Sequence, residues 1–162
     1  MKQLLQLSKE GFSFLSGNEG IELRPYKDSK SLWTIGLGHL LTQEELAKGI
    51  LKIGDTSILF WQKPLTMDQA LLLFQQDSKR FSTTLNTEVH PQLTQTQFDA
   101  LFSFIFNIGV GGFLKSTVLA RLNSGNFIDV PSAMMMWRKP PEIRTRRERE
   151  CKLFKTGTYS HG

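Results

Sequence analysis

Apolar residues recur at helical spacing along much of this chain, and polar capping signals stand before several of these runs. A first helix is predicted from about Ser8 to Ser16, with Gly17-Asn18 as its stop signal. Three capping boxes, in which Thr is followed three residues later by Glu or Gln, begin at Thr42, Thr66 and Thr94. They predict helices over 42–53 and 66–85 and, after residue 94, the most apolar helix of the chain.

The C-terminal third continues the helical pattern. Ser116 is a candidate N-cap for a helix to about Asn123, and Pro131 begins a short apolar run through Trp137. Pro140-Pro141 breaks the chain, and a charged helix is predicted over 142–155. Its inward side is expected to carry Ile143, Arg147, Cys151 and Phe154. The interspersed Glu142, Glu148 and Glu150 are expected on a salt-bridged, solvated face.

Only residues 22–41 have the character of a sheet. Lys27-Asp28-Ser29-Lys30 is typical of a turn tip, because Asp and Ser bond locally to the backbone. Thr34 to His39 is predicted to return as a strand, and Pro25 is expected at an edge or a bulge. Residues 55–64 give no clear pattern and are taken as a loop packed over the first lobe.

These elements place the chain in the α+β class, mostly helical, with one small antiparallel sheet and a long connecting helix. At 162 residues the chain is long enough for one domain with a sizeable core. We predict a single catalytic domain over 1–162 with two lobes around a groove. The N-terminal lobe covers about 19–66, the connecting helix about 67–85, and a helical lobe about 86–162 plus the N-terminal helix.

The amino-acid composition limits the classes of partner and cofactor that the chain could bind, but it does not identify one of them. The net charge is +5 and the pI is about 9.5, which favours polyanions such as nucleic acid, anionic membrane or an acidic cell wall. The single cysteine excludes an intramolecular disulfide, and the Cys and His residues have no metal-ligand spacing. No metal or cofactor is therefore expected. Residues 1–10 lack an apolar core segment, so neither a signal peptide nor a membrane anchor is predicted.

The candidate chemistry lies between Glu19 and His39. Glu19 and Asp28 flank a short extended segment, one at a helix end and the other at a turn tip. Glycoside hydrolysis uses two carboxyl groups in this way: one protonates the leaving oxygen, and the other attacks or activates water. Burial at the helix end would suit Glu19 as the proton donor. Glu22 is the less favoured acid and the natural control.

The whole segment is more specific than the carboxyl pair. It reads Glu-Gly-x-x-Leu-x-x-Tyr-x-Asp-x-x-x-x-x-Thr-Ile-Gly-x-Gly-His. This string closely resembles the active-site segment of phage lysozymes, glycoside hydrolase family 24. Ser31 stands where family members usually have Gly, which concerns the conformation of the turn. Phe154 to Tyr159 resembles the end of T-even members, and Arg146, Arg147 and Glu150 resemble lambdoid members.

The resemblance implies roles for further residues. Thr34 would hold a water beside the scissile bond, and His39 would pair with Asp77 as a structural support. The positions matching Leu40, Phe106 and Ser116 line the groove in the family. A substrate-binding Asn near Pro131 is absent here, and Ser132 is its candidate replacement. Arg144 would lie beside Glu19 and orient the acid.

The resemblance implies an endolysin that cleaves the β-1,4 bond between N-acetylmuramic acid and N-acetylglucosamine of peptidoglycan. We expect a monomer that accumulates in the host cytoplasm and reaches the periplasm through a holin-type pore. Two alternatives stay open: a lytic transglycosylase, and a cationic protein whose basic C-terminal helix binds anionic outer-membrane lipid. Intact Glu19, Asp28 and Thr34 argue against an inactive peptidoglycan binder. Nucleic acid is not an expected partner, because no recognisable binding module is present.

Overall fold

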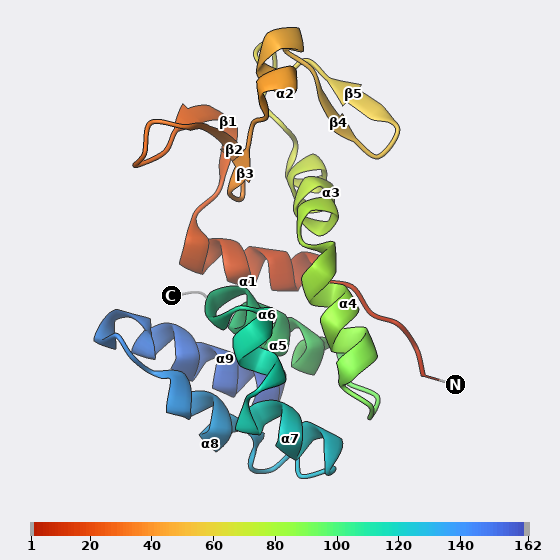
Figure 1. The fold of residues 1–162 in the computed structure, drawn as a ribbon, viewed down its shortest axis with the longest axis vertical. Coiled ribbons are helices and arrows are strands. Elements are labelled where there is room, and N and C mark those ends of the chain that lie inside the picture. The colour runs from red at the N-terminus through yellow and green to blue at the C-terminus, as the bar shows by residue number, and fades with distance from the viewer. Residues whose placement is uncertain (1, 161–162) are drawn as a thin grey trace. The chain divides into compact units, whose positions relative to one another are not determined.

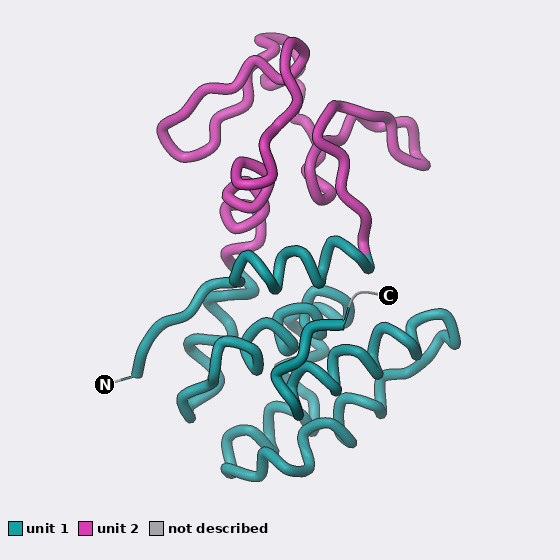
Figure 2. Tube along the Cα trace, turned by 180° about the vertical axis from the view of Figure 1, so that it is seen from behind, with its two compact units in different colours: residues 1–18, 80–162 teal, residues 19–79 magenta. Residues whose placement is uncertain are grey.

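The computed structural model describes residues 2–160 and contains two compact units. Unit 1 combines the chain up to residue 18 with the chain from residue 80 onward, and unit 2 comprises residues 19–79 (Figure 2). Unit 1 is helical, whereas both small sheets belong to unit 2 (Figure 1). The mixed, mostly helical class predicted from the sequence is confirmed.

Unit 2 begins with a three-stranded antiparallel sheet in the order β1-β2-β3. Its elements are β1 (Glu22–Lys27), β2 (Trp33–Gly36), β3 (His39–Leu40), α2 (Gln43–Lys48), β4 (Leu51–Ile53), β5 (Thr56–Ile58) and α3 (Met67–Asp77). The edge strand β1 has an irregular register between Glu22 and Tyr26. Pro25 lies in this interval, as expected for a residue that cannot donate to a sheet ladder.

The predicted helix over 42–53 is wrong in its second half. The capping box at Thr42 is present, but α2 ends at Lys48 because Gly49 adopts a left-handed conformation, with φ of 67°. Residues 51–53 then form β4, with Leu51 and Ile53 buried and the residue between them exposed. Strand β4 pairs with β5 across Gly54-Asp55, so part of the loop predicted over 55–64 is a strand.

The connecting helix predicted over about 67–85 is divided at Ser78. Helix α3 ends at Asp77, and α4 runs from Lys79 to Glu88. The Ser78 hydroxyl donates to the carbonyl of Phe74, one turn earlier, a bond that competes with the backbone ladder and often bends helices. The boundary between the two units follows immediately, after residue 79.

Unit 1 is built around α5, which carries eight consecutive buried residues from Phe98 to Ile105. Its helices are α1 (Lys9–Glu19, whose last residue is counted with unit 2), α4, α5 (Gln95–Ile108), α6 (Val110–Leu114), α7 (Thr117–Asn123), α8 (Val130–Met134) and α9 (Arg144–Thr156). Two short 3-10 turns, η1 (Met135–Trp137) and η2 (Pro141–Ile143), precede α9. Helix α9 packs against α5 and α8. The capping box at Thr94 and the N-cap at Ser116 are confirmed.

Asp99 of α5 forms hydrogen bonds to residues near both ends of the chain. It is 1% exposed and accepts hydrogen bonds from the Ser8 backbone and hydroxyl, from Gln95 and from Tyr159. The Ser8 hydroxyl in turn accepts from the N–H of Gly11 in the first turn of α1. The start of α1 is thereby fixed to the core of unit 1. Within residues 2–160, no helix combines the length and apolar character needed to cross a bilayer.

Candidate active site

Asp28 is held in a tight turn between β1 and β2. Its Oδ1 atom accepts hydrogen bonds from the N–H groups of Lys30 (2.8 Å) and Leu32 (2.9 Å), and its own N–H donates to the Leu32 carbonyl (2.9 Å). Ser31 closes the turn with φ of 62°, a left-handed conformation that favours glycine. The backbone therefore fixes the orientation of this carboxyl group.

Thr34 is tied to the same turn. It lies in β2 opposite Tyr26 and Leu40, and it is 3% exposed. Its hydroxyl donates to the Leu32 carbonyl at 3.0 Å, the carbonyl that also accepts from the Asp28 N–H. One carbonyl group thus binds both the Asp28 backbone N–H and the Thr34 hydroxyl.

Glu19 is the last residue of α1, and Gly20, with φ of 80°, ends the helix before β1 begins. The side chain of Glu19 is exposed, which differs from the burial expected for a proton donor. Glu22 is also exposed and pairs with Gly36 at the start of β1. Both carboxyl groups are therefore open to solvent, and burial does not distinguish the predicted acid from its control.

His39 joins three elements of unit 2. Its Nδ1 lies 2.7 Å from Asp77 Oδ2 of α3, and its Nε2 lies 3.0 Å from Glu45 Oε1 of α2. Burial lowers the pKa of His39, but hydrogen bonds and charge attraction from Asp77 and Glu45 outweigh it, so the pKa is raised above the usual 6.5. The partnership with Asp77 suggested by the sequence is present, and it acts as a clamp on strand β3.

Leu40 lies in β3 of unit 2 and is 52% exposed, and the remaining predicted site residues belong to unit 1. Phe106 of α5 is partly buried, with its ring centroid 5.6 Å from that of Phe81. Ser116 is 8% exposed, and its hydroxyl accepts from the Leu119 N–H as the N-cap of α7 and donates to the Phe113 carbonyl. Ser132 is exposed and accepts from Arg121 at 3.0 Å. Arg144 forms an exposed pair with Glu148, also at 3.0 Å.

Comparison with known proteins decides the family. The phage lysozyme family model matches residues 16–150, which include the Asp28 turn, the His39 clamp and most of unit 1. The chain belongs to the phage lysozyme family. An endolysin of Acyrthosiphon pisum secondary endosymbiont phage 1 is 30% identical over 94% of this chain and 99% of its own.

Two solved structures extend the comparison to the fold. A mutant of P22 lysozyme is 32% identical, with a TM-score of 0.75 over 93% of this chain and 98% of its own. The muramidase domain of SpmX from Asticaccaulis excentricus is 31% identical, with a TM-score of 0.66 and the same coverages. The protein is therefore a lysozyme-type glycosidase, and its peptidoglycan-hydrolysing function follows from its family.

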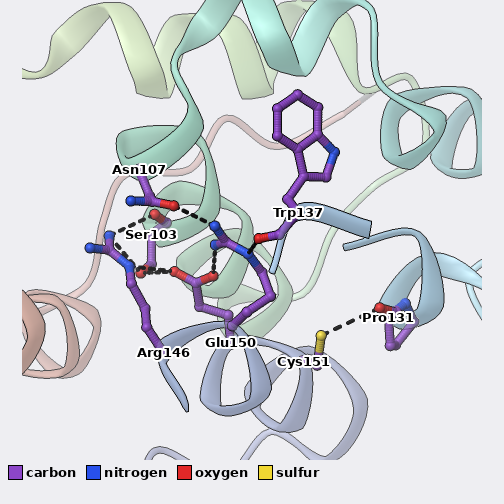
Figure 3. A network of polar contacts seen from close by, with 8 residues as sticks. Ser103, Asn107, Pro131, Trp137, Arg146, Glu150 and Cys151 are labelled. Carbon is purple, nitrogen blue, oxygen red and sulfur yellow. Dashed lines mark hydrogen bonds and ion pairs between the residues drawn. The ribbon is translucent and has the colours of Figure 1, made fainter. Parts of the chain in front are cut away.

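The charged face predicted for the C-terminal helix is partly interior. Arg147 and Glu150 of α9 are both fully buried, and Glu150 accepts hydrogen bonds from Arg146, Arg147 and Ser103 (Figure 3). The Arg147 guanidinium also donates to the Trp137 carbonyl at 2.9 Å and to the Asn107 side chain. Arg147 was predicted on the inward side of this helix, and its burial confirms this. Glu150 was expected on a solvated, salt-bridged face. The structure corrects this, because Glu150 and Arg147 together fix α9 to α5 and to the turn η1.

The sequence did not identify two of these supporting residues. Glu45 was recognised only as part of a capping box, yet its Oε1 accepts from the Thr42 N–H (2.9 Å) and also contacts His39. Glu150 was taken as a surface charge. The position of Glu45, six residues after a strand histidine, was the available signal. Among the residues described, no cluster of His, Cys, Asp and Glu could hold a metal ion.

Proposed function

We propose that the enzyme hydrolyses the β-1,4 bond between N-acetylmuramic acid and N-acetylglucosamine in bacterial peptidoglycan and so lyses the host cell. The observation that carries the residue assignment is the turn in which Asp28 and Thr34 share the Leu32 carbonyl. Family membership supplies the class of substrate, and this turn supplies a fixed carboxylate beside a hydroxyl group.

Glu19 acts as the general acid. It donates a proton to the glycosidic oxygen as the bond to the anomeric carbon breaks, and the second carboxyl group stabilises the positive charge that develops on the sugar ring. Because Glu19 is exposed in the free protein, the bound glycan must exclude water from it.

Asp28 Oδ1 is engaged by two backbone N–H groups, so Oδ2 is the oxygen that acts on the substrate. It serves either as the nucleophile or as the base for a water. The Thr34 hydroxyl donates to a carbonyl, which leaves its oxygen lone pairs to accept a hydrogen bond from that water. Product anomer analysis by NMR separates the two routes, because direct attack of water inverts the configuration and a covalent intermediate retains it.

The test of the assignment is turbidity loss of Gram-negative cells stripped of their outer membrane. We expect Glu19→Gln and Asp28→Asn to lose at least about a hundredfold in lytic rate, in line with the loss of acid–base catalysis. Glu22→Gln changes another exposed carboxyl group three residues from Glu19, and as the matched control it should keep wild-type activity. Lysis by folded Glu19→Gln at the wild-type rate would remove Glu19 from the mechanism.

Hydrolysis and transglycosylation leave different products. Hydrolysis adds water and leaves a reducing end, whereas a lytic transglycosylase forms an anhydro sugar. We expect mass spectrometry of digested peptidoglycan to show reducing ends. A product lighter by one water on each cleaved chain would favour the transglycosylase instead.

Four further residues are proposed supports of the substrate or the acid. Phe106 offers an aromatic ring, Ser132 an exposed hydroxyl and Ser116 a helix cap, and Arg144 would orient Glu19. Because the polar groups of Ser116, Ser132 and Arg144 already have partners within unit 1, the aromatic ring of Phe106 is the strongest candidate of the four. Phe106→Ala should raise KM more than it lowers kcat, and a pure kcat effect would argue against substrate contact.

Anionic outer-membrane lipid is a second proposed partner, through the exposed cations of α9 and the segment before it. The buried face of α9 packs on α5 and α8, and Arg147 is fully buried, so the folded helix offers charge without an apolar face. We expect the whole protein to bind anionic vesicles in a salt-dependent manner without permeabilising them. A synthetic 138–155 peptide tests the isolated helix. If neither binds, the lipid is not a partner.

The route to the cell wall is also a proposal. We infer accumulation in the host cytoplasm, release through a holin-type pore and action as a monomer on the periplasmic side of the wall. Cell fractionation before and after pore expression tests the route. Protein found outside the cytoplasm without a pore would overturn it, and sedimentation velocity reports the oligomeric state.

A further inference from the structure

The last turns of α1 pack against the guanidinium group of Arg149 from α9. The Cζ atom of Arg149 lies over the Phe14 ring, 5.3 Å from its centroid, and Phe14 is itself fully buried. A Cβ atom at Gly17 would stand 3.9 Å from Arg149 Nη2, so the guanidinium also reaches the backbone of the helix. Glu19, the proposed general acid, follows two residues later as the last residue of α1.

Two nitrogens of this guanidinium are buried without a hydrogen-bond acceptor. Within the part of the chain that the structure describes, Nε and Nη2 of Arg149 have no partner, and the same holds for the buried Nδ2 of Asn18. Nε and Nη2 form one edge of the guanidinium, the kind of edge that a carboxylate accepts in a bidentate pair. Because no carboxylate occupies this edge, Arg149 presents an unpaired positive charge to the end of α1.

This arrangement does not serve the stability of unit 1. A buried donor without an acceptor gives up its hydrogen bonds to water and gains none in return, so each such donor makes folding less favourable. A flexible apolar side chain such as Met would pack on the Phe14 ring without that penalty. Buried donors left unpaired in a folded protein call for an explanation other than stability.

The positive charge acts on the end of the helix. The last carbonyl groups of an α-helix have no partner within the helix and give its C-terminal end a partial negative charge. A cation beside this end attracts these carbonyl groups and favours one orientation of the last turn. Helix α1 ends at Glu19, because Gly20 adopts a left-handed conformation with φ of 80°. The backbone of the proposed acid therefore belongs to the turn on which Arg149 acts.

We propose that Arg149 is a positioning residue for hydrolysis, whose charge fixes the last turn of α1 and thereby the backbone from which Glu19 reaches the substrate. The proposal rests on the proposed function, because it assumes that Glu19 is the general acid. Arg149 does not touch the glycan and acts only through the placement of the acid. Arg144 of the same helix forms an exposed pair with Glu148, whereas the Arg149 guanidinium lies against α1.

Arg149→Met removes the charge and keeps an apolar side chain on the Phe14 ring. We expect kcat on purified peptidoglycan to fall at least about tenfold, because a small displacement of a catalytic group is costly. KM should stay within about twofold, since no substrate contact is lost. The urea midpoint should be unchanged or higher, because two unpaired buried donors are removed. A loss of stability that accompanies the loss of kcat would make Arg149 a structural residue and overturn the proposal.

A conservative variant and a matched control test the role of the charge. Since Nε and Nη2 donate no hydrogen bonds, an ammonium group can supply the same charge, and Arg149→Lys should recover most of the lost kcat. If Arg149→Lys were as slow as Arg149→Met, the charge would not be the cause. Arg80 also lies over a phenylalanine ring, 4.7 Å from the Phe81 centroid, but it is exposed. Arg80→Met should therefore keep the wild-type kcat.

A double variant separates the positioning role from the proposed function. Because Arg149 acts only through Glu19, adding Arg149→Met to Glu19→Gln should cause no further loss of rate, and a further loss would overturn the proposal. A wild-type rate in Arg149→Met beside an inactive Glu19→Gln would refute the positioning role and leave the proposed function standing. Full activity of Glu19→Gln would instead refute the proposed function, and the role of Arg149 with it.

Discussion

The buried charge pair of α9 allows a quantitative test of what holds unit 1 together. Glu150 is fully buried and accepts from Arg146, Arg147 and Ser103, and Arg147 is itself fully buried. Glu150→Gln keeps the shape of the side chain but removes its charge, so one buried cation loses its counter-charge. Breaking one half of a buried pair costs about 3–5 kcal/mol. Because the amide oxygen of Gln can still accept a hydrogen bond, we expect a loss near the lower end, about 3 kcal/mol.

The same helix supplies the matched control. Glu148 pairs with Arg144 at 3.0 Å, but the two side chains are 57% and 65% exposed. Glu148→Gln makes the same chemical change on the surface, where such pairs contribute about 0–1 kcal/mol. The contrast between the two variants therefore isolates burial as the cause.

Urea unfolding followed by circular dichroism measures both variants. Glu150→Gln should lower the midpoint without changing the slope, and its melting temperature should fall by roughly 6–12 °C for a chain of this size. Raising the salt concentration should leave this loss unchanged, because buried pairs are poorly screened. A loss below about 1 kcal/mol, equal to that of Glu148→Gln, would refute the reasoning from burial.

Three further predictions concern the pairing of His39 with Asp77 and Glu45, the turn at Ser31 and the thiol of Cys151. Because the pKa of His39 is raised by Asp77 and Glu45, its contribution to stability is complete below about pH 6.5 and is lost as the pH rises through the higher folded pKa. Thermal melts from pH 5 to 9 should show this decline, and His39→Gln should flatten it. Ser31→Gly should raise stability by about 0.5–1 kcal/mol in urea unfolding, since relief of the left-handed φ exceeds the added unfolded-state entropy. Burial beside Glu150 raises the pKa of Cys151 to about 12, so a disulfide reagent at pH 8 should react slowly with native protein and rapidly in denaturant; equal rates would contradict this.

Capping residues in the sequence predicted correctly where several helices begin. The capping boxes at Thr42, Thr66 and Thr94 all form, with each Thr accepting from the N–H three residues later. The N-cap at Ser116 and the left-handed stop at Gly157 are also present. These signals act over one helical turn and need no distant partner, so the sequence is sufficient to find them.

The ends of helices and the breaks within them were harder to predict from the sequence. The predicted helix over 42–53 failed because Leu51 and Ile53 fit a helical face and also the alternation of a short strand. Only pairing with residues 56–58 settles this in favour of a strand. The break at Ser78 likewise depends on a hydroxyl group that bonds back to Phe74, a choice that the residue type alone does not force.

The sequence by itself determined the family, the α+β class and the segment that carries Glu19, Asp28 and Thr34, because a dense local motif encodes them. It did not determine that Glu150 lies inside. Helical periodicity predicted the inward position of Arg147, but Glu150, three positions along, fits a surface charge, and only packing of α9 against α5 and α8 removes it from water together with Arg147. The contact between His39 and Glu45 likewise depends on how β3 and α2 pack together in the folded chain. Burial and pairing across elements are properties of the folded chain, since they depend on which faces meet, and no local pattern records that.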